Sequence, residues 1–320
     1  ARIRAGKARP GILALMRAAG REPSRASPYD LGFVVGPRLN AAGRLEDMSQ
    51  GIACLLADDF ETAANLATGL DTLNRERREI EADMQASALA SLEKTDPGNG
   101  CSIVMFDPEW HPGVVGLLAS RLKDRYHRPT ICLAAGPDGT LKGSGRSIPA
   151  LHLRDALDLV DRRNPGLIPK FGGHAAAAGL SLKADDVERF RAAFEATVAG
   201  LVTPADLART VDTDGPLHDR HLNLDTADLL AGQVWGQGFP PPLFEDDFEV
   251  REQRTVGDGR HRKLTLRRVG GRDDIAAMRF NEPEPLPERI RAAYRVEANE
   301  FRGNRSLQLM LEHWQVASIP

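Results

Sequence analysis

The sequence predicts an α/β domain followed by a β-barrel, with a long helix ahead of both. Segments typical of strands and helices alternate between residues 101 and 202, as in an α/β domain with a mixed sheet and flanking helices. After about residue 205 several short strand-like segments follow one another, as in a small barrel of the OB type. Apolar residues recur at helical spacing from residue 58 to about residue 94.

The first hundred residues predict helices separated by turns. Pro10 begins a short helix, because proline lacks the N–H that a first helical turn leaves unbonded. Residues 36–44 form a turn-rich element with two cations and an amide. Asp58 and Asp59 cap the long helix, which would reach about 50 Å at 1.5 Å per residue. Turn-forming residues 95–100 then mark a domain boundary.

The α/β segment predicts four extended stretches and three helices. The strands are expected at residues 102–106, 130–134, 141–148 and 176–182, and the helices at 113–123, 151–160 and 185–202 with the long helix before them. Strands of the barrel are expected at 248–256, 261–269 and 274–280 and within 291–316. Glycine pairs at 257–259 and 270–271 supply the turns.

Composition excludes several classes of protein. Hydrophobic residues make up 42% of the 320 residues and charged residues 27%, as in ordinary globular proteins. No apolar run approaches the roughly 18–20 residues that span a bilayer, so we expect no membrane association. The three cysteines are widely spaced and odd in number, which favours reduced thiols and a cytoplasmic location. The chain begins at Ala1 without a preceding strand or cap, so we expect a piece of a longer protein.

Charge is unevenly distributed although the net charge is only −3. Residues 1–44 carry a local +7 and residues 251–272 a local +6. Basic segments on an otherwise acidic chain are typical of nucleic-acid binders, although most charge runs are solvated faces. Alternation in the barrel strands predicts one cationic face that could follow a nucleic-acid backbone, formed by Arg254, Arg262, Lys263, Arg267 and Arg268.

Two glycine-rich segments predict phosphate binding. Residues 171–179 combine Gly172, Gly173 and His174 with a row of alanines, which exposes backbone to a ligand. Residues 142–147 place Ser144, Gly145 and Arg146 together, and an arginine beside hydroxyls suits two phosphate oxygens.

Histidines supply the remaining candidate ligands. His111 precedes a Pro-Gly helix start, where the helix dipole favours anions. Structural roles remain open for both His111 and His174. The pair His218 and His221 is interpreted as surface, and Asp212 with Asp214 as a loop. We therefore expect no metal site, Ser-His-Asp arrangement or dinucleotide motif within the chain.

Four ordered motifs resemble the RecJ single-stranded-DNA-specific exonucleases of the DHH phosphoesterase superfamily. They occupy residues 36–45, 110–116, 143–147 and 172–179, and residues 236–244 and 299–303 resemble the OB domain of that family. The resemblance implies the end of a DHH domain at 1–50, a connecting helix at 51–95, a DHH-associated domain at 96–204 and an OB-like domain at 205–320. Arg262 stands where the family pattern leads us to expect an apolar residue.

The family implies a 5′→3′ exonuclease of DNA repair and recombination. Its Mn²⁺ or Mg²⁺ ligands would lie in an N-terminal domain that this chain almost entirely lacks, so the chain alone is expected to be inactive. Single-stranded DNA is the implied partner, with a single-stranded-DNA-binding protein and a helicase as further candidates. By resemblance, Arg38, Asn40 and Arg44 border the cleft, Ser144 and Arg146 bind phosphate at the 5′ end, and His174 with Gly172 and Gly173 faces the substrate backbone. His174 is the candidate catalytic residue, because it could donate to a scissile-phosphate oxygen.

Two alternative functions remain open. An oligonucleotide or cyclic-dinucleotide phosphodiesterase would share the DHH-associated domain, but it would not need the β-rich segment. A non-catalytic single-stranded-DNA-binding scaffold would have lost its metal site, and the residues upstream of Ala1 would distinguish it.

Overall fold

The computed structural model describes residues 1–92, 100–136, 139–236, 238–301 and 303–317. The chain divides into two compact units, Ala1–Arg209 and Thr210–Pro320, and each is treated by itself below. The predicted boundary at residues 95–100 falls almost entirely outside the described residues. No described helix is long and apolar enough to cross a membrane.

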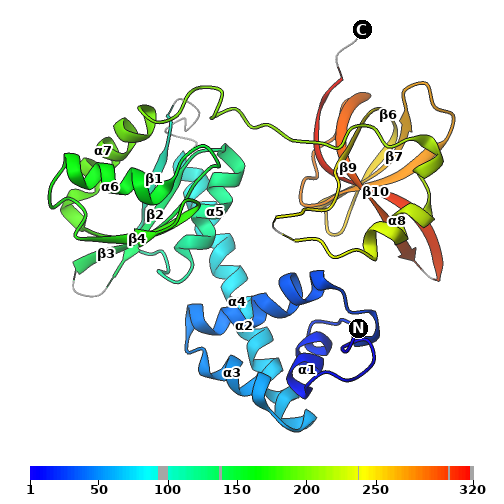
Figure 1. Ribbon diagram of the computed structural model, residues 1–320, viewed down its shortest axis with the longest axis horizontal. Helices are drawn as coiled ribbons and strands as arrows, with labels where there is room; N and C mark the ends of the chain where they lie inside the picture. Colours follow the sequence, from blue (N-terminus) through cyan, green and yellow to red (C-terminus); the bar gives the residue numbers. More distant parts are fainter. Residues whose placement is uncertain (93–99, 137–138, 237, 302, 318–320) are drawn as a thin grey trace. The chain divides into compact units, whose positions relative to one another are not determined.

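Short helical segments form the N-terminal part of the first unit, and the three α-helices among them pack on the first half of one long helix (Figure 1). They are α1 (Pro10–Ala18), a 3₁₀ turn (Pro23–Arg25), a π-helix (Asp30–Val35), α2 (Gly36–Leu45) and α3 (Ser49–Leu56). A Cβ on Gly11 would lie 2.0 Å from the Cys54 carbonyl oxygen, so α1 and α3 meet without a side chain between them. The predicted turn-rich element at 36–44 is wrong: it is helix α2, because Pro37 fits the first helical turn.

The long helix is α4 (Phe60–Leu92). The predicted cap is confirmed, since the Asp59 carboxylate accepts the Thr62 N–H at 2.8 Å. Ala63, Ala67 and Leu70 bury the first half of α4 against α1–α3, whereas the second half packs against the sheet domain. One helix therefore contributes to two hydrophobic cores.

A mixed sheet follows, as predicted, but it has a fifth strand at Lys170–Gly173 that was not predicted. The strands are β1 (Ile103–Phe106), β2 (Thr130–Ala135), β3 (Thr140–Arg146), β4 (Lys170–Gly173) and β5 (Ala177–Lys183), in the order β1-β2-β3-β5-β4. β1 and β2 are parallel and the other pairs antiparallel. Helix α5 (Val115–Tyr126) contacts β2 and β3, while α6 (Leu153–Arg163) and α7 (Val187–Ala199) share a second core with the sheet.

Alternation along the strands separates the two faces of this sheet. Leu141, Leu180 and Leu182 are buried in the core that contains α6 and α7. Lys142, Ser144 and Arg146 alternate with them and therefore lie on the α5 side. Helix α5 packs on β2 and β3. Gly172 of β4 and Gly179 of β5 are exposed. The α5 side thus has a covered half and an open half.

The second unit is a closed five-stranded barrel, which confirms the predicted barrel. Its strands are β6 (Phe244–Val256), β7 (His261–Arg268), β8 (Asp274–Arg279), β9 (Arg289–Phe301) and β10 (Asn304–Val316), in the order β10-β8-β7-β6-β9. A 3₁₀ turn (Asp219–His221) and α8 (Leu224–Ala231) precede them. Helix α8 was not predicted, although Asn223 caps it by accepting the Thr226 N–H at 2.9 Å.

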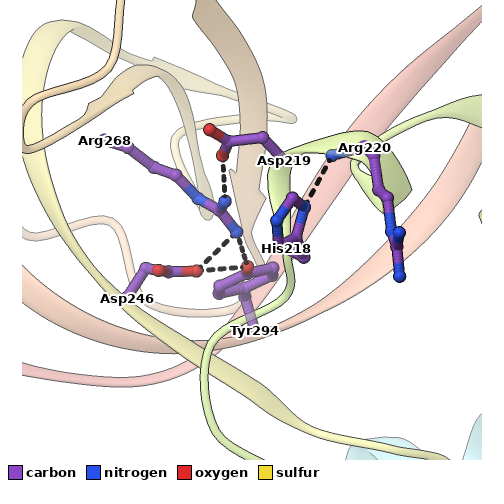
Figure 2. A network of polar contacts seen from close by, with 6 residues as sticks. All are labelled: His218, Asp219, Arg220, Asp246, Arg268 and Tyr294. Atoms are coloured by element: carbon purple, nitrogen blue, oxygen red, sulfur yellow. Dashed lines mark hydrogen bonds and ion pairs between the residues drawn. The ribbon is translucent and has the colours of Figure 1, made fainter.

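A polar network that is largely buried at the barrel and exposed at Asp219 ties the segment before α8 to the barrel (Figure 2). Arg268 donates to Asp246 at 2.6 Å, to the Tyr294 hydroxyl at 2.7 Å and to Asp219 at 2.7 Å. Tyr294 in turn donates to Asp246 at 2.6 Å. Burial raises the pKa of Asp246 and that of Tyr294. Because their charges are paired and hydrogen-bonded, Arg268 and Asp246 can be largely buried beside the apolar core.

Candidate functional site

Arg146 and Ser144 lie side by side at the start of α5. Both side chains project from β3 toward α5. Arg146 Nη1 donates to Ser144 Oγ at 3.1 Å and to the Gly145 carbonyl oxygen at 2.8 Å. Gly116 makes this approach possible, since a Cβ there would lie 2.9 Å from Ser144 Oγ and 3.1 Å from Arg146 Nη2. The helix start, a hydroxyl and a guanidinium therefore converge. The motif predicted the two side chains as phosphate ligands, and that role stays a prediction.

Arg146 lacks a carboxylate partner within the part of the chain that the structure describes. Burial lowers the pKa of its guanidinium, and the positive charge of Arg44 lowers it further. A half-buried arginine beside a second cation is costly unless an anion neutralises it. The electrostatics therefore favour an anionic ligand.

Arg44 reaches this cluster from α2. Its Nη1 donates to the Gly113 carbonyl at 3.1 Å, and a Cβ on Gly113 would lie 2.1 Å from the Arg44 carbonyl oxygen. His111 completes the same turn, because its Nδ1 accepts the Gly113 N–H at 3.1 Å. The structure therefore brings Arg44, His111, Ser144 and Arg146 to one place, and it gives His111 a structural role in the turn besides any ligand contact.

Two predicted cleft residues on α2 do not join the cluster. Arg38 is buried, forms an ion pair with Asp71 at 2.8 Å and donates to the Val34 carbonyl at 2.7 Å. Asn40 is exposed. These contacts give Arg38 a role in holding α2 against α4.

The glycine-rich segment 171–179 is a β-hairpin rather than a loop. Gly172 pairs with Gly179 across β4 and β5, and the turn closes where His174 N–H donates to the Ala177 carbonyl at 2.8 Å. A Cβ on Gly173 would lie 2.4 Å from that carbonyl oxygen, so the hairpin requires glycine there. His174 is exposed at the turn, and its catalytic role stays a prediction.

Gly145 faces away from the cluster. A Cβ there would lie 2.8 Å from Leu153 and 3.2 Å from Ile131, on the side of α6. Because successive residues of a strand alternate between faces, Ser144 and Arg146 share a face that Gly145 does not. Gly145 thus serves packing, and only its carbonyl contacts Arg146.

The cations predicted to share one face of the barrel do not all lie on the same face. Arg262 is buried and donates from Nε to the Pro283 carbonyl at 2.7 Å, on the same side of β7 as Leu264. Lys263 and Arg254 are direct cross-strand partners on the other side. Arg267 shares that side but forms an ion pair with Asp274 at 2.8 Å. The grouping of Arg262 with Lys263 is therefore wrong, because the strand period of two separates neighbours.

Arg254 and Lys263 border a shallow groove over β6 and β7. The groove has a volume of about 620 Å³ and is also lined by Glu252 and Thr265. A register shift between Val250 and Glu252 bends β6 beside it. Two cations therefore lie at one groove, and their contact with a nucleic-acid backbone stays a prediction.

Residues that could hold a metal ion do not gather in the described ranges. No group of three or more histidine, cysteine, aspartate or glutamate side chains is found there. Asp214 accepts the Leu243 N–H at 2.9 Å, which fits the predicted loop role. The described residues therefore offer no set of ligands that fits a divalent metal centre.

A buried ionic cluster between α4 and α5 was not predicted from the sequence. Glu81 on α4 accepts from Arg77 at 2.6 Å and from Arg121 on α5 at 2.8 Å, and Arg77 also donates to Asn74 at 3.0 Å. Burial lowers the pKa of Arg77, and Arg44 is among the cations that lower it further. The signal was the presence of charged residues within the apolar stripe of α4.

Family models match both sheet-containing regions of the chain. Residues 99–200 match the DHHA1 domain and residues 213–313 match the RecJ OB domain. The site described above combines the first of these regions with Arg44 of α2.

Similar proteins and structures carry the same name. Single-stranded-DNA-specific exonuclease RecJ of Salmonella typhimurium is 49% identical over 97% of this chain and 55% of that protein. The RecJ of Escherichia coli is 48% identical over 98% of this chain and 56% of that protein. A crystal structure of RecJ with Mg²⁺ from Thermus thermophilus superposes with a TM-score of 0.82 at 27% identity, covering 99% of this chain and 48% of that one. The chain thus spans about half the length of these relatives, and it belongs to the RecJ family, whose DHHA1 and OB domains it carries.

Proposed function

We propose that this chain is the DNA-binding part of a single-stranded-DNA-specific 5′→3′ exonuclease of repair and recombination. The observation that carries the proposal is the half-buried Arg146 guanidinium, which has no carboxylate partner in the described ranges and lies beside Ser144 and Arg44 at a helix start. A terminal 5′ phosphate supplies the charge and the acceptors that this cluster lacks. The relatives named as single-stranded-DNA-specific exonucleases support the substrate class.

The division of labour within the protein is part of the proposal. Residues 1–50 end a DHH domain, α4 connects it to the domain at 96–204, and the barrel at 205–320 contacts the strand through Arg254 and Lys263. The related Thermus structures were solved with Mg²⁺ or Mn²⁺. We expect such ions to be held by a domain outside this sequence, in a cytoplasmic protein that works with a single-stranded-DNA-binding protein and a helicase.

Binding of 5′-phosphorylated and 5′-hydroxyl oligothymidylates by this chain tests the proposal. Hydrogen bonds to charged groups contribute about 1.5–3 kcal/mol, so the phosphorylated strand should bind roughly 10- to 150-fold more tightly. Arg146→Ala should abolish that preference and reduce the slope of log K against log salt by about 0.7. Arg154→Ala, at an exposed arginine of α6, is the matched control.

Two results would contradict the proposal. Equal affinities of the wild-type chain for the two oligonucleotides would remove the 5′-phosphate site, and an undiminished preference in Arg146→Ala would remove Arg146 from it. Hydrolysis of either oligonucleotide by this chain in Mn²⁺ or Mg²⁺ would show that the metal ligands do not lie elsewhere.

A further inference from the structure

The open half of the five-stranded sheet carries three lysines that the 5′-phosphate site does not use. Lys142, Ser181 and Lys170 are direct partners across β3, β5 and β4, so they form one row on one face. Lys183 lies two residues beyond Ser181 and shares that face. The whole chain has only seven lysines, so three of them on one small surface are a marked concentration of charge.

The lysine row has no ionic partner in the described residues. Lys142 Nζ donates to Ser181 Oγ at 3.2 Å, and Lys170 and Lys183 are exposed without an ion pair among these residues. Each ammonium therefore keeps donors free for an anion. Because these are strongly hydrated point charges, they suit phosphate groups without demanding a fixed geometry.

The row next to the lysines on this face consists mainly of glycine backbone. Ser144, Gly179 and Gly172 form the adjacent row, and both glycines are exposed. A Cβ on Gly179 would approach only the Gly143 carbonyl at 3.8 Å, and one on Gly172 would meet nothing within 4 Å. A sugar-phosphate chain can therefore lie flat across this strip without displacing a side chain.

The lysines are too far from Arg146 to bind the same phosphate group. Four residues of extended strand separate Lys142 from Arg146, which is roughly 13 Å between their Cα atoms. The two side chains also diverge, since Lys142 reaches across to β5 while Arg146 contacts Ser144 and lies against Gly116. The face therefore offers two separate positions for negative charge.

We propose that Lys142, Lys170 and Lys183 form a second anion subsite, which binds a further phosphate group of the strand whose end is held at Arg146. The inference rests on the proposed function. It adds a defined track over the open half of the sheet, in which cations flank a strip of glycine backbone.

Oligothymidylates with a 5′ phosphate and one neutral methylphosphonate linkage, moved stepwise along the strand, test this subsite. The wild-type chain should bind most weakly when the neutral linkage occupies the position above the lysines. The double variant Lys142→Gln, Lys170→Gln should lose this position dependence but keep its preference for a 5′ phosphate. The slope of its log K against log salt should be smaller by about 0.7 than that of the wild type. Lys123→Gln, at a lysine of α5 paired with Asp124, is the control.

The outcomes separate the two proposals. A double variant with the wild-type position dependence and salt slope would overturn the second subsite while leaving the site at Arg146 intact. A wild-type chain without any 5′-phosphate preference would instead overturn the proposed function. Because all three lysines are at the surface, circular dichroism of the variants should match that of the wild type.

Discussion

Gly116→Ala should weaken the binding of a 5′-phosphorylated strand while changing the free energy of unfolding only slightly. The new methyl group would lie 2.9 Å from Ser144 Oγ and 3.1 Å from Arg146 Nη2. Both distances are shorter than van der Waals contact, so the guanidinium must move. Nη2 and Nε donate no hydrogen bond within the described ranges, whereas Nη1 makes two, so Nη2 is one of the two nitrogens that remain for a ligand. The substitution therefore displaces the donors that remain for a ligand.

Two effects of Gly116→Ala on the free energy of unfolding have opposite signs. Alanine is favoured over glycine inside a helix by about 1 kcal/mol, which offsets the cost of moving the end of a long side chain. The free energy of unfolding should change by less than about 1 kcal/mol. Losing one hydrogen bond to a charged group costs about 1.5–3 kcal/mol, so the Kd for a 5′-phosphorylated strand should rise at least roughly tenfold.

Fluorescence anisotropy with phosphorylated and unphosphorylated oligothymidylates, together with urea unfolding, measures both quantities. Gly51→Ala in α3 is the control, because its Cβ would meet side chains only at 3.5 Å or beyond. It gains the same helical preference without touching the site. An unchanged preference for the 5′ phosphate in Gly116→Ala would refute the reasoning that places the ligand at this guanidinium.

Two further predictions concern the hairpin and one histidine. Gly173→Ala should destabilise the chain by about 1–3 kcal/mol in urea unfolding, because its φ of 149° and the Ala177 carbonyl oxygen at 2.4 Å leave no room for a methyl group. Gly172→Ala is the control and should be nearly neutral, because the space at its Cβ is open. Equal effects of the two substitutions would contradict this account of the hairpin. His127, at a φ of 49°, has a lowered pKa because of burial and then of nearby Arg209. Since the unfolded chain takes up that proton first, the stability that neutral His127 confers should be full above about pH 6.5 and decline as the pH falls toward the lowered folded pKa. His127→Asn, which tolerates the same backbone conformation, should show a smaller decline between pH 7.5 and 5.5, and parallel pH profiles would count against the assignment.

Local patterns in the sequence were sufficient for most of the architecture. The Asp59 cap, the apolar stripe of α4 and the alternation of β7 each depend on residues close together in the chain, and each has the predicted structure. Prediction failed where local signals conflict with packing. Residues 36–44 contain glycine and proline and suggest turns, but burial against α4 makes them helix α2.

The motifs identified the candidate phosphate ligands, but not their geometry. Ser144 and Arg146 were recognisable by residue type, because hydroxyl and guanidinium groups suit phosphate wherever they lie. Only the tertiary structure placed Gly116 against them, brought Arg44 from another helix and turned Gly145 to the opposite face. It likewise separated Arg262 from Lys263 and aligned Lys142 with Lys170 across three strands. The physical reason is that side-chain chemistry is a property of each residue, whereas proximity depends on strand register and helix packing between distant segments.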